Sequence, residues 1–495
     1  MGANLTEKEY RCVCQACDEI LKLGSYSLAR ISVAWLHPIR LHPIFSSKYQ
    51  SLFKPWSIFF LEFIAILLKS SLQLYIFFLK SLLHPRSLVI NVKKVDCLII
   101  SHLTNVLQFV SDRRDSYCGE VASALQKTGI TSDSLFINHT KATKYSREKT
   151  GVAHHLLPAP ISFWATLWVI KAQVLEFYRV ISLLLVPNST FKKKVILRAA
   201  VECLSNSTRF NLVLAINIKT YLANSSIRAI ITTFEGHSWE RVVYHVANKY
   251  DTKILRFGYQ HAFIFSNQHG AMRRLNNASD PDYVLTSGEI SSSRLFQKGE
   301  WSRKEILLVG KSIQNSEEVN FDKSRDKVCL VIPEGIETEC EILFKYSLSC
   351  ANVFPEVEFI WRLHPIINFS DLRNKYPFLS NLPKNIHLSQ VDLATDASRA
   401  RWVLYRGSMA VIESCLKGAG PIFLKKYDSD FMLDPLEDLV GQRRVVSSEA
   451  DFKAVFQSDF PSENNMKNIG MYCRKIFTNF NGSPIIDKLM VGVQK

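Results

Sequence analysis

The sequence has 495 residues, 47% of them hydrophobic, and lysine and arginine exceed aspartate and glutamate by 16. The length corresponds to two or three domains of roughly 100–200 residues each, and the apolar content is sufficient for globular cores. The basic balance favours an anionic partner such as a nucleotide, an acidic membrane leaflet or nucleic acid. Nucleic acid is the weakest of these partners, because the lysines form no long basic run and no strand interleaves them with aromatic residues.

The cysteines indicate a reducing compartment. Eleven are spread along the chain, and only Cys12, Cys14 and Cys17 form a cluster. A zinc site at this cluster would need a fourth ligand, and none follows at the usual spacing, so we expect no metal there. No charged-then-apolar leader ends at a small-residue cleavage site, so we predict a cytoplasmic protein.

Residues 51–83 form a long apolar stretch that Lys54, Glu62, Lys69 and Lys80 interrupt. A spanning helix needs about 18 or more nearly charge-free residues, so we expect no span here. On a helix these charges share a sector of roughly 100°, opposite a broad apolar face. This pattern is typical both of a helix in the membrane interface and of a helix packed on the protein's own core.

A second apolar stretch, residues 160–195, carries the lysine run 192–194 near its end. Together with residues 51–83 it favours peripheral contact with an anionic membrane. We therefore predict that residues 1–90 are an N-terminal helical segment that can associate with a membrane.

From residue 91 onward, short apolar runs alternate with helix-length segments, which is typical of α/β domains with parallel sheets. The runs of the first half are residues 95–103, 134–140, 227–236, 252–261 and 282–288, and those of the second half are residues 327–335, 357–365, 385–390, 401–408 and 419–426. We predict two doubly wound domains, residues 91–315 and 316–495, that face a central cleft. The run 305–313 is expected to bridge them.

Parallel sheets bind ligands beyond the carboxyl ends of their strands, so the residues that follow each run are the candidate site residues. In the first domain Glu235 and His237 follow one run, and Gln260 and His261 end the next. We expect His237, Gln260 and His261 to contact an acceptor or a sugar. A purely structural role for His261 is an equal alternative.

The strand ends of the second domain carry Glu334, Gly335, Arg362, His364, Arg406, Gly407 and Ser408. Pro365 fixes φ directly after His364, so that this imidazole can be held toward a ligand. Ser408 would open a helix and offer its hydroxyl and free backbone N–H groups to a phosphate. The alternatives are a histidine in a turn at the sheet edge and a serine that only caps a helix.

Two acidic triplets, residues 280–282 and 428–430, have the D-x-D form. Neither follows an early strand as a metal-dependent nucleotide-sugar site requires. We interpret both as surface acids.

The motifs of the second half resemble a known family. The run "WRLHPI" (361–366) and the later "YRGSMAVIESCLKGAGPIFL" (405–424) resemble the donor-binding half of GT-B glycosyltransferases. The His-Pro dipeptide, preceded by the strand and loop "LVIPEGIETE" (330–339), is similar to bacterial CMP-sugar transferases, namely sialyltransferases and Kdo transferases. "FEG" (234–236) resembles the acidic-acidic-glycine motif of the sialyltransferases, except that Phe234 occupies the first acidic position.

The resemblance implies a GT-B-like fold of two Rossmann-like domains and a role for each matching residue. His364 would contact the donor phosphate, Ser408 would supply a phosphate-binding hydroxyl, and Glu413 would bind the ribose. Glu235 would act as general base, or as nucleophile if configuration is retained. The donor-binding residues would be Glu334, Gly335, Arg362, Arg406, Ser408 and Glu413.

The resemblance thus implies a glycosyltransferase that moves an acidic sugar, Kdo or another nonulosonic acid, from CMP to a hydroxyl of a surface glycan. It would need no metal and no cofactor beyond the CMP-sugar donor. One alternative is a CDP-polyol phosphotransferase of wall or capsule polymer synthesis, and another is a non-catalytic membrane-associated scaffold with a nucleotide-binding fold. We expect a cytoplasmic protein, peripheral on the inner membrane through residues 51–83 and 160–195.

Overall fold

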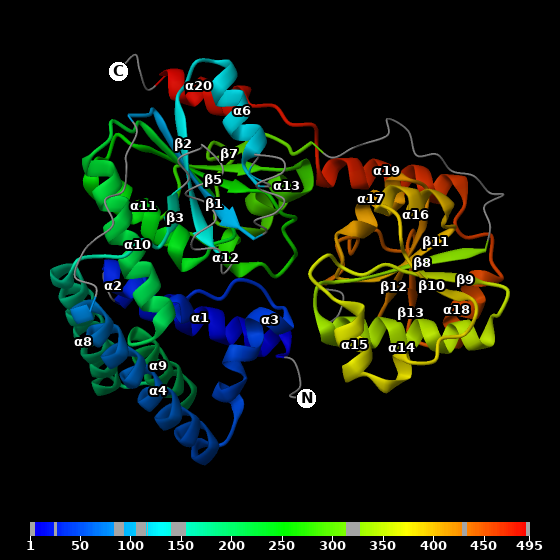
Figure 1. The fold of residues 1–495 in the computed structure, drawn as a ribbon, viewed down its shortest axis with the longest axis horizontal. Coiled ribbons are helices and arrows are strands. Elements are labelled where there is room, and N and C mark those ends of the chain that lie inside the picture. The colour runs from blue at the N-terminus through cyan, green and yellow to red at the C-terminus, as the bar shows by residue number, and fades with distance from the viewer. Residues whose placement is uncertain are drawn as a thin grey trace. The chain divides into compact units, whose positions relative to one another are not determined.

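The structure is a computed structural model. It describes residues 5–23, 27–83, 94–104, 115, 117–139, 155–312, 327–427 and 433–491. The chain forms two compact units, which we call unit 1 (residues 1–311 and 480–495) and unit 2 (residues 312–479) (Figure 1). Our predicted second domain differs at its end, because Ile485 and Leu489 of α20 (Ser483–Val491) join the core of unit 1. The boundary predicted near residue 315 lies outside the described residues.

Unit 1 contains a parallel seven-stranded sheet in the order β3-β2-β1-β4-β5-β6-β7. Its strands are β1 (Cys97–Leu103), β2 (Ser132–Asn138), β3 (His155–Leu157), β4 (Ala229–Thr233), β5 (Leu255–Gln260), β6 (Tyr283–Thr286) and β7 (Ile306–Leu308). The run 305–313 supplies β7, which pairs with β6. It is therefore a strand of the first sheet, and the prediction that it bridges two domains was wrong.

Alternating side chains of this sheet enter two different cores. Leu98 and Ile100 pack with α10 (Asn206–Ala223) and α11 (Ser238–Tyr250). Cys97 and Ile99, which point to the other face, pack with α6 (Gly119–Lys127) and α20. Both faces are thus covered, which explains why the strands read as continuous apolar runs.

Unit 2 contains a parallel six-stranded sheet in the order β10-β9-β8-β11-β12-β13. Its strands are β8 (Val328–Pro333), β9 (Glu358–Trp361), β10 (Ile386–Leu388), β11 (Trp402–Arg406), β12 (Gly420–Leu424) and β13 (Arg444–Val446). Helices α14 (Glu337–Val353), α15 (Phe369–Lys375) and α18 (Glu449–Phe456) lie on one side, and α16 (Leu393–Arg399), α17 (Ala410–Leu416) and α19 (Glu463–Ile476) lie on the other (Figure 1). Two doubly wound parallel-sheet units are confirmed. That they face a central cleft stays a prediction.

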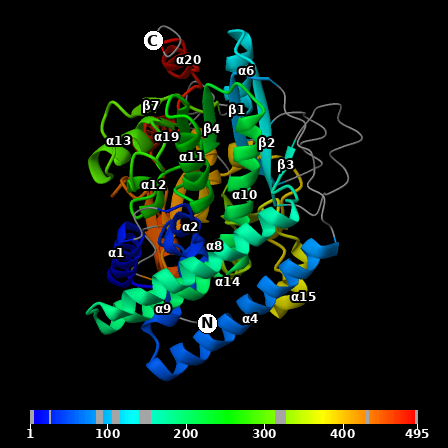
Figure 2. The same cartoon turned by 90° about the vertical axis from the view of Figure 1, so that its left-hand side faces the viewer.

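The remaining helices belong to unit 1. They are α1 (Glu7–Leu23), α2 (Leu28–Ile31), α3 (Pro43–Ser46), α4 (Trp56–Leu83), α8 (Phe163–Ile181), α9 (Thr190–Cys203), α12 (His269–Met272) and α13 (Glu289–Lys298). Helix α4 packs beside α8 and α9, and the three run side by side (Figure 2).

Helix α4 is the one helix among the described residues that is long and apolar enough to cross a membrane, judged by length and composition alone. The most apolar 18-residue stretch of α4 has a mean hydropathy of 1.6, and only 11% of this stretch is buried. That α4 does not cross a membrane stays a prediction, because length and composition alone do not test it. Lys54 precedes the helix, whereas Glu62, Lys69 and Lys80 lie within it.

Candidate functional site

The loop after β4 carries Glu235, Gly236 and His237 into α11, and a buried carboxylate of that helix holds it in place. Glu240 accepts the backbone N–H groups of Glu235 at 3.0 Å, Gly236 at 2.7 Å and His237 at 2.8 Å. Gly236 has φ +86°, a conformation that L side chains rarely adopt. The loop therefore has one defined shape at the carboxyl edge of the sheet.

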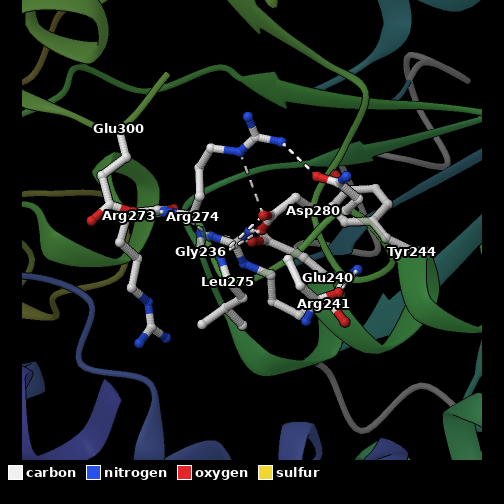
Figure 3. Close-up of polar contacts among 12 residues, drawn as sticks. Gly236, Glu240, Arg241, Tyr244, Arg273, Arg274, Leu275, Asp280 and Glu300 are labelled. Atoms are coloured by element: carbon white, nitrogen blue, oxygen red, sulfur yellow. Dashed lines mark hydrogen bonds and ion pairs between the residues drawn. The ribbon is translucent and has the colours of Figure 1, made fainter. Parts of the chain in front are cut away.

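Beneath this loop, Arg241 and Asp280 form a buried ion pair (Figure 3). Arg241 also donates to the backbone oxygens of Gly270 at 3.0 Å and Arg273 at 3.1 Å. Asp280 is only 1% exposed. Our prediction that residues 280–282 are surface acids is therefore wrong for Asp280, because the carboxylate balances a buried guanidinium. The second triplet, residues 428–430, lies outside the described residues.

Glu235 and His237 form a hydrogen-bonded pair at 3.3 Å, with their side chains 27% and 30% exposed. Burial alone would raise the pKa of Glu235. The hydrogen bond from His237 and the charges of His261 and Arg40 outweigh burial and lower that pKa to about 2. Burial would lower the pKa of His237, but Glu235 and Glu240 raise it above its ordinary value. The pair thus holds a carboxylate beside an imidazole that is readily protonated.

Two further histidines, which sequence reasoning missed, lie at the same edge of the sheet. His102 ends β1 in contact with His139, with 2.8 Å from Nδ1 to Nε2, and its Nε2 lies 3.1 Å from the Thr233 hydroxyl. Burial and the neighbouring histidines lower the pKa of His102 to about 3. A signal was present, because the apolar runs 95–103 and 134–140 each lead into a histidine, as the run before His261 does.

Gln260 and His261 lie at the end of the neighbouring strand β5. Gln260 is fully buried, and within the described part of the chain neither amide atom has a hydrogen-bond partner; the same holds for the Ser287 hydroxyl. The ring of His261 meets Tyr117 edge-on at 4.8 Å between centroids, and burial lowers the pKa of His261 to about 4. The predicted site residues of unit 1 thus follow the neighbouring strands β4 and β5, and His102 and His139 follow the adjacent strands β1 and β2 at the same edge.

We expect Glu235→Gln to lower the pKa of His237, because only the charge of Glu240 then opposes the effect of burial. The stability that the pair contributes should be greatest between about pH 4.5 and 6.5. It should fall as pH rises through the raised pKa of His237, and also as pH falls toward the depressed pKa of Glu235. Histidine NMR titration of wild type and Glu235→Gln, assigned with His237→Asn, measures the shift. An unchanged His237 pKa in Glu235→Gln would contradict the pairing.

In unit 2 the ends of β8, β9 and β11 meet. A Cβ atom added to Gly335 would lie 2.9 Å from Nδ1 of His364, and one added to Gly407 would overlap the carboxylate of Glu334. The Ile366 N–H lies 3.4 Å from Nδ1 of His364, which favours the tautomer that carries its proton on Nε2. Partial burial lowers the pKa of His364, against the charge of Glu334. His364 is therefore neutral at neutral pH and can donate from Nε2.

Two arginines of unit 2 are already engaged within the unit. Arg406 is 1% exposed and pairs with Glu339 at 2.5 Å, which corrects our prediction that it contacts the donor. Arg362 pairs with Asp396 at 3.0 Å, and its side chain is 26% exposed. Both guanidiniums satisfy buried carboxylates, which would otherwise be left uncompensated.

The two remaining predicted residues follow β11. Ser408 is 7% exposed, and α17 begins at Ala410 with Met409 as its N-cap. The prediction that Ser408 opens the helix is thus wrong by two residues. Glu413 lies within α17, and burial raises its pKa.

In the described part of the chain, no group of three or more histidine, cysteine, aspartate and glutamate residues is arranged to hold a metal ion. All eleven cysteines are described and none forms a disulfide. In the cluster on α1, Cys12 is exposed, whereas Cys14 and Cys17 are buried.

No family model and no curated protein matches this chain. Solved structures with a related arrangement include the UDP-GlcNAc 2-epimerase of Methanocaldococcus jannaschii, at 14% identity and a TM-score of 0.45, covering 80% of this chain and 99% of the epimerase. The calicheamicin glycosyltransferase has 11% identity and a TM-score of 0.48, with 81% and 99% covered. The spinosyn rhamnosyltransferase bound to thymidine diphosphate has 12% identity and a TM-score of 0.43, with 80% and 100% covered. These likenesses, all with TM-scores below 0.5, carry no inference about activity.

Proposed function

We propose that this protein is a metal-independent glycosyltransferase of the GT-B type that transfers an acidic sugar, Kdo or another nonulosonic acid, from CMP to a glycan hydroxyl. The observation that carries the proposal is the meeting of Glu334, His364 and Gly407 at the carboxyl edge of the second sheet. These residues come from three strand ends, where a doubly wound sheet binds its ligand. All three lie in the motifs that resemble CMP-sugar transferases.

On the donor side, the Nε2–H of His364 donates a hydrogen bond to the phosphate of CMP. The phosphate gains negative charge as the bond to the sugar breaks, so this hydrogen bond strengthens in the transition state. Ser408 and Glu413 follow the same strand end and contact the phosphate and the ribose. Arg362 pairs with Asp396 at the end of β9, and its partly exposed side chain can also contact the nucleotide.

On the acceptor side, the Glu235–His237 pair receives the proton of the attacking hydroxyl. A carboxylate with a pKa of about 2 is a weak base by itself, so the imidazole takes the proton and Glu235 stabilises the imidazolium. The new bond joins the acceptor oxygen to the sugar, and CMP leaves. If configuration is retained, Glu235 is instead the nucleophile.

The acceptor in this proposal is a surface glycan or its lipid-linked precursor at the cytoplasmic face of the inner membrane. The basic net charge of +16 favours an anionic donor, an anionic sugar and an acidic membrane surface. Two other functions give different ligand preferences: a CDP-polyol phosphotransferase would prefer CDP, and a scaffold would bind no cytidine nucleotide.

We expect metal-free calorimetry to show that CMP binds more tightly than CDP, UDP or GDP. His364→Ala should weaken CMP binding by about 1.5–3 kcal/mol, the range for a hydrogen bond to a charged group. His387→Ala is the matched control, because His387 is an exposed histidine of β10 in the same unit. It should leave CMP binding unchanged.

The other results assign the protein differently. Tighter binding of UDP or GDP, or no effect of His364→Ala, would overturn the CMP-sugar assignment. Preference for CDP would favour the phosphotransferase, and the absence of any cytidine nucleotide binding would favour the scaffold.

A further inference from the structure

Helix α4 exposes large apolar side chains along much of its length. Leu61, Leu68 and Leu72 are 69%, 66% and 59% exposed, and the buried residues of the helix are Phe59, Ser70 and Ser81. A surface helix of a water-soluble protein usually turns polar residues outward instead. Packing on the protein's own core, one of the two alternatives for this stretch, therefore does not account for the exposed leucines.

Helix α8, which packs beside α4, exposes a second apolar strip. Trp164, Trp168, Leu175 and Tyr178 recur at helical spacing, and Trp164 is 76% exposed. Tryptophan and tyrosine are the residues enriched where a membrane meets water. We call the exposed apolar residues of α4 and α8 together the α4–α8 face.

Charges around the α4–α8 face are mainly positive. Lys69, Lys80 and Lys171 are exposed. The two carboxylates on these helices are both neutralised, since Glu62 pairs with Lys54 at 2.5 Å and Glu176 pairs with Arg30. The charge of this surface therefore complements anionic lipid headgroups.

The lysine run 192–194 contributes less to this charge than we predicted. Lys192 pairs with Glu19 at 2.7 Å. Lys194 is buried and donates to the Leu52 carbonyl at 3.2 Å. Lys193 is exposed. Two of the three lysines are thus structural, because they connect α9 to the N-terminal segment.

We propose that the α4–α8 face inserts into the interface of an anionic bilayer, with α4 parallel to the membrane plane. Helix α4 packs against α8 and α9, so crossing the bilayer would break these contacts. Crossing would also place Lys69, near the middle of the helix, in the hydrocarbon core, where a lysine is costly. In the parallel orientation, the lysine stems can extend to the headgroups. This proposal is independent of the nucleotide that unit 2 binds.

Flotation of the full-length protein with vesicles tests the proposal. We expect binding to phosphatidylcholine vesicles that contain phosphatidylglycerol, weaker binding to phosphatidylcholine alone, and weakening by salt. The triple variant Leu61→Gln, Leu68→Gln, Leu72→Gln should bind at least about a hundredfold more weakly, because three side chains no longer favour the apolar interface. Lys69→Gln with Lys80→Gln should remove most of the preference for phosphatidylglycerol.

The matched control is Val353→Gln with Val440→Gln, two valines of unit 2 that are 56% and 82% exposed. This variant should bind vesicles like wild type. Circular dichroism checks that each variant is folded, and all the substituted side chains are exposed.

Three results would overturn the proposal. One is vesicle binding that the triple variant retains. Another is protein that resists extraction from vesicles at alkaline pH, which would show that α4 crosses the bilayer. The third is a soluble dimer that the triple variant abolishes while vesicles bind neither form, which would make the face an interface between two copies.

Discussion

Arg241→Met is expected to lower the free energy of unfolding by about 3–5 kcal/mol, the cost of removing one partner of a buried ion pair. Arg241 and Asp280 are 0% and 1% exposed, so the remaining carboxylate would stay buried with only the longer contact to Arg274, at 3.7 Å, to balance its charge. The backbone oxygens of Gly270 and Arg273 would lose a donor as well. The cost is large because these acceptors hold the segment after β5 against α11.

Urea unfolding of the full-length protein, followed by circular dichroism, measures the free energy of unfolding of wild type and Arg241→Met. Arg11→Met is the control, since the side chain of Arg11 is 72% exposed in its pair with Glu7, and its loss should cost about 0–1 kcal/mol. Adding Asp280→Asn to Arg241→Met should recover part of the stability, because the amide oxygen can still accept the Leu275 N–H without carrying a charge. Equal effects of Arg241→Met and Arg11→Met would show that the buried pair is not formed.

Gly236→Ala should lower the free energy of unfolding by about 3 kcal/mol or more. A positive φ costs an L-residue about 1–2 kcal/mol, and the new Cβ would also overlap the backbone of Gly270, which has no rotamer to move. The loop that carries Glu235 and His237 would have to shift. The variant should therefore also change the His237 pKa, which a purely global loss of stability would not do.

Gly129 provides the matched control for this prediction. Its φ is +76°, close to that of Gly236, but nothing lies within 4 Å of an added Cβ. Gly129→Ala should therefore show the cost of φ alone, about 1–2 kcal/mol. If urea unfolding showed similar losses in the free energy of unfolding for Gly236→Ala and Gly129→Ala, the close approach of Gly236 to Gly270 would contribute nothing to the cost.

The strands could be predicted from the sequence because both faces of each sheet are covered. Buried strands read as continuous apolar runs, and all ten runs quoted for the two halves correspond to strands of the two sheets. The short strands β3 and β13 escaped prediction. Glu235, His261 and His364 were found because parallel sheets bind ligands beyond the carboxyl ends of their strands. Applied to every run, the same rule would also have found His102 and His139.

The sequence by itself determined the local order of helix and strand, the α/β class and the polar residues that follow each strand, because hydrophobic periodicity and strand ends are properties of neighbouring residues. Only the tertiary structure decided which strand ends adjoin, that Asp280 and Arg406 are buried partners rather than available groups, and that α4 leaves many of its large apolar side chains exposed. Periodicity shows which side chains share a face of an element. It does not show what covers that face, because the covering residues come from distant parts of the chain.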